Sequence, residues 1–437
     1  MNKIRGNVIG TPLKPGESIV KATDLSEEQK AQARANIGAA GIEDTKVTVD
    51  SLWSSKNIVD KLCPTFTESG SVVACEPVEG YPLEVVSKIV PPQSGSGDPS
   101  PENVRPIESW TGANLWHGGK NLVNINNAVL RDGKTPMPVV DNGVVWKAGN
   151  TYFFYILFDT PIPAGTTLYC NWDSETDSLG NNVRYCNVFD ETFSDVSTTA
   201  GPGGVMITAK PAYGLSLGKI NGDMPVAEDI VISNIRVTAQ VGEDYEPYRG
   251  EEFTADFGET HEGGGSYNWN TGVLTIDSAM VTLTGEEKYS QYLDYVYTTS
   301  VPTDAKVGPN SKVIGYCSHV PQDGTADGTL DKQMLYHAAS NGGLQFTNLT
   351  TRWGLAEATV DAMKAFLAEQ YAKGTPVQIT YKMADPYTIR FDPQEILALS
   401  GVNTLYCDMG DTAVSGRADP TAIIERLSIA VTAMLEG

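Results

Sequence analysis

Residues 143–172, GVVWKAGNTYFFYILFDTPIPAGTTLYCNW, decide the fold class of this 437-residue chain. The apolar stretches GVVW and TYFFYILFDT flank a turn at Ala148, Gly149 and Asn150, and PIPAG separates the second stretch from TTLYCNW. Gly, Asn and Pro between β-branched and aromatic runs are typical of the turns that join antiparallel strands. The stretch therefore predicts three strands in succession.

The same pattern continues toward the C-terminus. Further short strands are predicted at GVMITAK (204–210), AYGLSLGKI (212–220) and DIVISNIRVTAQV (229–241). We interpret residues 121–250 as an antiparallel β-sandwich of jelly-roll type, in which Ile235 and Val237 face the core. The 43 glycines and 25 prolines of the chain supply the turns that many short strands need.

Composition and charge exclude several classes of function. Lys and Arg total 31 against 54 Asp and Glu, which gives a formal net charge of −23. Such acidity excludes nucleic acid as the main partner, because phosphate backbones bind through basic surfaces. The sequence has no apolar stretch of about 18 residues and no secretory signal at its start, so we expect synthesis in a cytoplasm and no membrane insertion.

Helices are predicted at both ends of the chain. Residues 22–41, ATDLSEEQKAQARANIGAAG, have a capping residue, acidic residues in the first turn and a terminating glycine, and 50–63 forms a second helix. A C-terminal helix begins with Asp419 as N-cap and Pro420 as first residue. The apolar stripe of 22–41 is too narrow to bury much area within one chain, so we expect these helices to pack against copies of themselves.

The remaining segments differ in character. Residues 66–120 are rich in Pro, Gly and Ser and are interpreted as an extended connector. Residues 251–390 predict a second β-rich, α+β domain with a hairpin turn at 270–272 and one helix within GLAEATVDAMKAFLAEQYAKG (354–374). The expected fold is mainly β and multidomain, divided into a helical attachment segment 1–65, the connector, the jelly roll, the second β domain and a C-terminal segment 391–437.

Two resemblances point to a class of protein. LSEEQKAQARANIGAAG (25–41) resembles an element that leads into trimeric shafts in tail-fibre, baseplate and head-fibre proteins of bacteriophages. KAGNTY (147–152) and the strand 232–248 are similar to carbohydrate-binding-like jelly rolls of phage receptor-binding proteins. These resemblances imply a homotrimer located in the phage virion, in contact with other virion proteins, that adheres to host-surface glycans.

Two other functions stay open. The chain can be a purely structural head-fibre, decoration or tail-tip connector protein, or a tail-associated glycan depolymerase. We expect no enzyme and no cofactor, because the four histidines are scattered and no nucleophile elbow, metal-protease or phosphate-loop motif occurs. Host, saccharide and position in the particle do not follow from the sequence.

Candidate site residues cluster in one segment. Tyr169 and Trp172 can stack on a sugar while Asp173 and Glu175 accept hydrogen bonds from its hydroxyls; a solvated loop is the other interpretation of WDSETDS (172–178). DGTADGTLD (323–331) can offer Asp oxygens to Ca²⁺ or form an ordinary turn, and no metal site is expected. The six cysteines lack metal-site spacing and are expected to be free thiols, with a Cys170–Cys186 disulfide left open.

Overall fold

The computed structural model describes residues 65–95, 99–219, 223–241, 244–293, 295–300, 316–320, 335–338 and 343–419. The described residues belong to one compact unit, Leu62–Gly437, and form antiparallel sheets with one α-helix among them. This confirms the expected mainly β, multidomain fold. The predicted helices at 22–41, 50–63 and the C-terminus, and the Asp-rich segment 323–331, lie outside the described residues.

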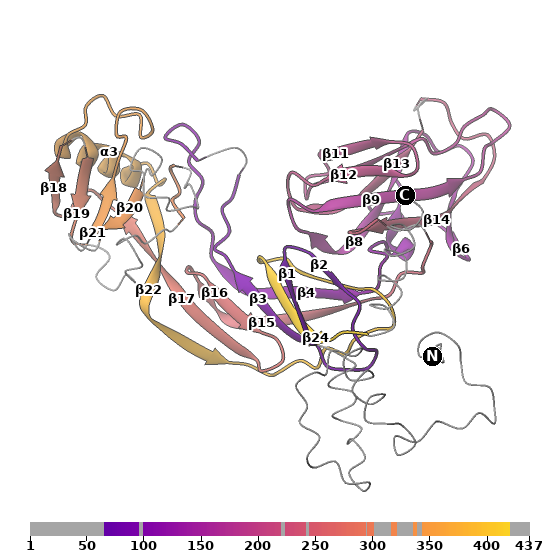
Figure 1. Cartoon of the computed structure of the whole chain (residues 1–437). Coiled ribbons are helices and arrows are strands. Elements are labelled where there is room, and N and C mark those ends of the chain that lie inside the picture. The colour runs from indigo at the N-terminus through magenta and orange to yellow at the C-terminus, as the bar shows by residue number, and fades with distance from the viewer. Residues whose placement is uncertain are drawn as a thin grey trace, which may run out of the picture. The chain divides into compact units, whose positions relative to one another are not determined.

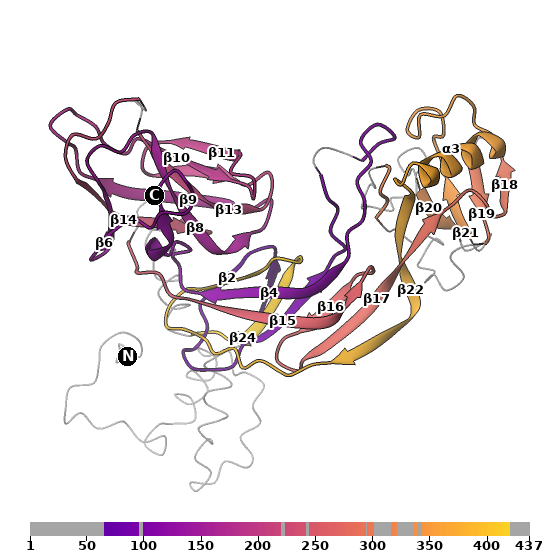
Figure 2. The same ribbon diagram turned by 180° about the vertical axis from the view of Figure 1, so that it is seen from behind.

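The predicted jelly roll consists of two five-stranded sheets packed face to face, shown as stacked layers in Figure 1 and from behind in Figure 2. The first, here the β13 sheet, has the order β11-β10-β13-β8-β5. Its strands are β5 (Ala128–Val129), β8 (Phe153–Ile162), β10 (Tyr185–Phe189), β11 (Asp195–Ala200) and β13 (Ala212–Gly218).

The second layer, here the β9 sheet, has the order β12-β9-β14-β7-β6. Its strands are β6 (Val139–Val140), β7 (Gly143–Trp146), β9 (Thr167–Ser174), β12 (Gly204–Ile207) and β14 (Ile230–Thr238). Side chains alternate along each strand, so Ile235 and Val237 of β14 face the core, each 1% exposed, as predicted. The turn at 147–152 joins β7 to β8, as the sequence predicts.

A separate base sandwich is built from segments far apart in the sequence. Its larger sheet has the order β1-β24-β3-β16-β17-β22 and its smaller sheet the order β15-β4-β23-β2. The first half of the strands is β1 (Thr65–Gly70), β2 (Val73–Cys75), β3 (Glu84–Ile89), β4 (Trp110–Gly118) and β15 (Gly250–His261). The second half is β16 (Gly265–Asn268), β17 (Val273–Leu283), β22 (Val377–Arg390), β23 (Asn403–Cys407) and β24 (Thr412–Arg417).

The base sandwich corrects two sequence expectations about domains. Residues 66–120 are not an extended connector throughout, because they supply β1 to β4, and their Pro-rich part lies between β3 and β4. Residues 251–390 are not one domain, because β15, β16 and parts of β17 and β22 belong to the base. Sequence patterns show strands but not their partners, and β1 pairs with β24 more than 300 residues away.

Two domains are inserted into hairpins of the base. The jelly roll lies between β4 and β15, whose residues Gly118 and Gly250 pair directly. The second insertion lies between β17 and β22, which pair from Val273↔Arg390 to Leu283↔Val377. Each insertion therefore enters and leaves through adjacent strands, and the base sheets remain continuous without it.

The second insertion is a small α+β domain. Four strands, in the order β18-β19-β21-β20, form its sheet: β18 (Tyr289–Tyr292), β19 (Tyr295–Thr298), β20 (Leu335–Ala338) and β21 (Gly343–Phe346). The predicted helix is α3 (Val360–Ala372), which lies over this sheet in Figure 1 and buries Met363 and Leu367. Thr359 caps its start, and Gly374, at φ 76°, ends it. Tyr371, near the end of the helix, is 53% exposed and does not contribute to its buried side.

Aromatic side chains join the jelly roll to the base. Trp116 of β4 stacks on Tyr406 of β23 at 5.1 Å, and both belong to the jelly-roll core. The Tyr406 hydroxyl donates to the carbonyl of Thr160 at 3.1 Å, and the Trp116 indole N–H donates to the hydroxyl of Tyr248 at 2.9 Å. Because these polar groups are satisfied where they are buried, the junction is well packed.

Candidate functional site

Trp172 does not form a sugar-stacking surface. It is 2% exposed and lies in the jelly-roll core with Leu168 and Cys170, and its indole N–H donates to the carbonyl of Val183 at 3.4 Å. The alternation of β9 places residues 168, 170 and 172 inward. The expectation that Trp172 contacts a ligand is therefore wrong, because the strand register turns its side chain into the core.

The other three candidates lie on the outward side of β9 or just after it. Tyr169 is half-buried, and Asp173 and Glu175 are exposed. Asp173 accepts a hydrogen bond from the Asn234 amide at 2.6 Å, and Glu175 accepts one from the backbone N–H of Val231 at 2.8 Å. The two carboxylates therefore accept hydrogen bonds from β14. The ring of Trp172 does not lie beside them on the outward surface.

Asp177 is the structural centre of the segment after β9. Its carboxylate accepts hydrogen bonds from the N–H groups of Leu179, Asn181 and Ala227 at 3.0, 2.7 and 2.7 Å. Burial alone would raise the pKa of Asp177, but the hydrogen bonds outweigh it and hold the pKa at about 2. WDSETDS is therefore the end of β9 followed by an ordered loop, in which Asp177 forms an Asx-type turn and is hydrogen-bonded to residue 227.

The outward side of the β13 sheet carries a cluster of aromatic rings. Tyr155 of β8 meets Phe189 of β10 and Phe193 of the following turn, each at 4.9 Å between centroids. Phe193 stacks on Phe189 at 5.0 Å, and Phe153 lies 5.2 Å from Tyr155. We name this surface the aromatic face; it comprises Tyr152, Phe153, Tyr155, Tyr185, Phe189, Phe193 and Tyr213.

Small residues on β13 make room for these rings. A Cβ at Gly218 would lie 2.4 Å from the Tyr185 ring, and one at Gly214 would lie 2.6 Å from the Phe189 ring. The rings of β10 therefore lie down over the central strand instead of standing upright from the sheet. Phe193, which is 43% exposed, offers a ring at the surface for stacking on a ligand, whereas Tyr155 and Phe189 are buried in the cluster.

Two members of the aromatic face have strained backbones. Tyr152 has φ 63° and Phe193 has φ 60°. The left-handed region costs a non-glycine residue about 1–2 kcal/mol, and strained residues of this kind concentrate at binding sites. The turn at Phe193 is held by Asp190, whose carboxylate accepts the N–H groups of Thr192 and Ser194 at 3.0 and 3.1 Å. Both rings are therefore held in place by backbone conformations that cost stability.

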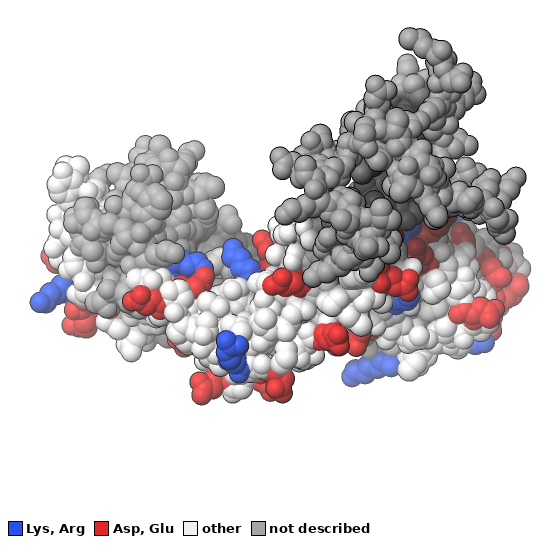
Figure 3. All heavy atoms as spheres, turned by 60° about the horizontal axis from the view of Figure 1, so that its bottom comes forward, with Lys and Arg blue, Asp and Glu red and all other residues white. Residues whose placement is uncertain are grey.

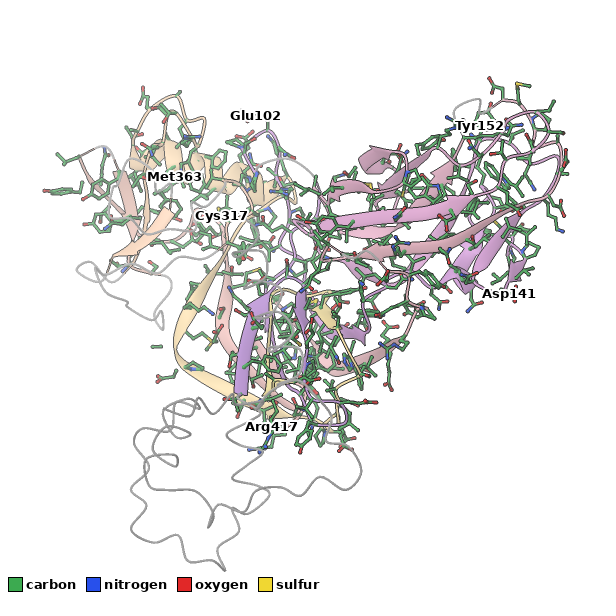
Figure 4. All side chains as sticks on the ribbon, turned by 45° about the vertical axis from the view of Figure 1, so that its right-hand side comes forward. Glu102, Asp141, Tyr152, Cys317, Met363 and Arg417 are labelled. Atoms are coloured by element: carbon green, nitrogen blue, oxygen red, sulfur yellow. The ribbon has the colours of Figure 1, made fainter. Side chains whose placement is uncertain are left out.

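Polar groups border the aromatic face. The guanidinium of Arg131 lies 4.3 Å from the ring centroid of Tyr152 and 5.2 Å from that of Phe153. The Asn187 amide donates to Asp195 at 2.9 Å, while the amide oxygen of Asn187 is buried without a partner. Burial, together with the charge of Asp195, raises the pKa of Tyr185, so its hydroxyl stays protonated and can donate. Figure 4 shows Tyr152 among the loops at one end of the jelly roll.

Histidines and cysteines have structural surroundings. His117 contacts Asn403 at 2.8 Å, His261 stacks on Trp110 at 4.7 Å, and His319 contacts Ser318 at 3.2 Å. Burial lowers the pKa of His319 to about 4, so this ring is neutral at physiological pH. The side chain of His337 lies outside the described residues.

The thiols among the described residues are free and buried, which answers the open disulfide question for this structure. Cys170 and Cys186 lie in facing sheets, not on paired strands, and their contact, with burial, raises the pKa of Cys186. Within the described part of the chain, no group of three or more His, Cys, Asp or Glu side chains is arranged to hold a metal ion.

Charge on the described surface agrees with the composition. Figure 3 shows Asp and Glu side chains scattered among Lys and Arg, with no basic stripe on the described part of that face. None of the described helices has the length and apolar character needed to cross a bilayer.

The sequence contains a feature that indicates the aromatic face. Phe153 to Phe158, FFYILF, is a continuous apolar run, which is typical of a strand covered on both sides. In an outer sheet of a two-layer sandwich, such a run leaves apolar side chains on the outward side. Pairing with Tyr185 and Phe189 could not be deduced, because it depends on the order of the strands.

The comparisons with known proteins identify no family for this chain. No protein-family model matches the chain, and no curated protein does. A structure of infectious bursal disease virus, Gx strain, is 10% identical and covers 83% of each chain with a TM-score of 0.11. A VP2 subviral particle of the same virus is 11% identical and covers 84% of this chain and 88% of that chain with a TM-score of 0.10. Scores this low do not show a shared fold, so nothing is inferred from them.

Proposed function

We propose that the chain is a structural protein of a bacteriophage virion, a tail-fibre or baseplate component that adheres to host-surface glycans through the aromatic face. The observation that supports this most is the cluster of aromatic side chains on the outward side of the β13 sheet, with Phe193 exposed at its surface. The virion assignment rests on the resemblance of residues 25–41 to phage fibre and baseplate proteins.

The chemistry of the aromatic face suits a sugar. A pyranose has an apolar side of C–H groups that packs on an aromatic ring, and hydroxyls around its edge that need donors and acceptors. Phe193 is 43% exposed and offers a ring at the surface. Asp195 offers an acceptor, while Arg131 and Tyr185 offer donors. A face built in this way binds and breaks no bond, so we propose no catalytic role.

The fold also suits attachment at one end. β1 and β24 pair from Thr65↔Arg417 to Gly70↔Thr412, so the segments before residue 65 and after residue 419 join the base at neighbouring strands. We propose that these flanking segments, with their predicted helices, assemble a homotrimer and contact other virion proteins. Three linked copies then convert weak sites into strong adhesion, because the second and third contacts form at a high local concentration.

The experiment compares apolar truncations on the two outward sides of the jelly roll. The purified chain is applied to an array of bacterial surface polysaccharides, together with Phe193→Ala and the control Ile207→Ala, which removes an exposed apolar side chain from β12 on the opposite sheet. We expect Phe193→Ala to lose at least about tenfold in affinity and Ile207→Ala to change little. Equal loss in both variants, or no binding to any glycan, would contradict the adhesive function and favour the purely structural alternative.

Two further measurements separate the alternatives. Light scattering of the whole chain tests the trimer, and a monomer at micromolar concentration contradicts it. Release of soluble saccharide from a bound polysaccharide would contradict the non-enzymatic mechanism and favour a depolymerase.

A further inference from the structure

Carboxylates surround the aromatic face on several elements. Asp223 accepts the hydroxyl of Tyr152, and Asp195, at the start of β11, accepts the amide of Asn187 at 2.9 Å. Burial, and then the charge of Glu191, raises the pKa of Tyr213, which places a third acidic group beside the face. These acids come from two segments, the β10–β11 hairpin and the connection between β13 and β14, so negative charge borders the rings at more than one place.

The cations beside the face are already engaged. Lys210 pairs with Asp190 at 3.2 Å, and Arg131 holds its guanidinium against the rings of Tyr152 and Phe153. A guanidinium that lies over two rings borders the site, and it is less available to pair with an anionic ligand than a freely moving side chain is. An anionic ligand would meet the carboxylates of Asp195, Asp223 and Glu191 beside the rings, while Lys210 and Arg131 already contact Asp190 and the rings.

We propose that the aromatic face is selective for neutral pyranose polysaccharides and rejects uronic acids, sialic acids and phosphate-bearing glycans. This inference rests on the proposed adhesive function and adds the ligand class. Like charges near the rings repel an anionic sugar, and an anionic group also loses hydration when it lies against aromatic surface. Neutral hydroxyls carry neither cost, and they can donate to the carboxylate of Asp195.

The test pairs glycans that differ mainly in charge. Wild-type protein and Phe193→Ala are titrated with galactan and with polygalacturonate, and in parallel with dextran, mannan, hyaluronan and polysialic acid. We expect a neutral polysaccharide to bind, acidic ones to bind at least about fivefold more weakly, and Phe193→Ala to remove the binding. We also expect affinity to change by less than about twofold between about 0.05 and 0.5 M NaCl, because little charge is neutralised.

The outcomes that would contradict the neutral selectivity differ from those that would also contradict the adhesive function. An acidic polysaccharide that binds tightest, loses affinity in Phe193→Ala and weakens with salt would overturn the neutral selectivity and leave the adhesive function standing. Binding that no aromatic-face substitution alters, or no binding to any polysaccharide, would overturn both.

A charge variant adds a second, independent readout. The double substitution Asp195→Asn with Asp223→Asn keeps hydrogen-bond acceptors and removes two negative charges. We expect it to narrow the difference between galactan and polygalacturonate by at least about twofold. An unchanged difference would mean that these carboxylates do not set the selectivity.

Discussion

The two outward sides of the jelly roll are built from strands of similar length over one shared core, yet they differ in chemistry. The β9 sheet exposes polar groups to water at its centre, such as Asn171 and Asp173, and its exposed aliphatic residues lie on the two edge strands, β12 and β6. The β13 sheet shows a layer of rings gathered over Gly214 and Gly218. A solvated antiparallel sheet normally alternates apolar inside with polar outside, and the departure on the β13 sheet is the reason that we propose this surface for ligand binding.

Among the substitutions that compare the two sides of the jelly roll, Trp172→Ala is expected to have the largest effect. Trp172 is in the core, so its truncation is expected to destabilise the jelly roll by about 3–5 kcal/mol. Urea unfolding followed by tryptophan fluorescence measures this change, and ligand affinity of the folded fraction should stay near that of the wild type. A variant that unfolds at the wild-type midpoint but no longer binds glycan would return Trp172 to the ligand site.

Gly214→Ala and Gly218→Ala test whether β13 positions the rings. The Cβ at 214 would lie 2.5 Å from the backbone carbonyl oxygen of Ile156, so we expect a loss of about 1–3 kcal/mol in stability. The Cβ at 218 meets the far end of Tyr185, which can turn away, so stability should change by less than about 1 kcal/mol while affinity falls. Equal stability losses with unchanged binding would show that the rings are only packing.

A pH titration tests the acceptor at the border of the face. Burial raises the pKa of Asp195 above its ordinary value, and the hydrogen bond from Asn187 opposes this. Arg131, Tyr155 and Tyr185 are its charged or titratable neighbours, and the tyrosines stay neutral in this range. Because the charged carboxylate accepts a sugar hydroxyl more strongly than the protonated group does, affinity should be full above the raised pKa and fall as the pH drops through it. Asp195→Asn should abolish this dependence; a variant that keeps it would assign the titration to another group.

The smallest effect is expected on the opposite side of the sandwich. Asp173→Asn and Glu175→Gln keep acceptors for Asn234 and Val231, so stability should change by less than about 0.5 kcal/mol and glycan affinity should not change. Calorimetric titration of these variants measures both quantities. Loss of affinity in either variant would support the residues that the sequence first suggested.

Local patterns predicted much of the fold and little of the site. The turn at 147–152, the inward Ile235 and Val237, and α3 with its terminating Gly374 follow from periodicity and turn chemistry, which act between neighbours in sequence. The base sandwich was not predictable in this way, because β1 and β24 pair across almost the whole chain.

The candidate site failed for a related reason. Trp172 lies one residue from the outward side of its strand, and a shift of one residue exchanges core for surface. The rings of Tyr155, Tyr185 and Phe193 come from separate strands and a turn, so their assembly depends on sheet order.

The most direct measurement is a matched pair of tyrosine truncations. Tyr185 and Tyr169 are both half-buried, both sit within a strand, and they project from opposite sides of the jelly roll. Affinity for a neutral polysaccharide should fall at least about tenfold in Tyr185→Ala and stay within about twofold of the wild type in Tyr169→Ala. The reverse result, with Tyr169→Ala losing affinity and Tyr185→Ala retaining it, would place the ligand on the β9 sheet and contradict the assignment of the aromatic face.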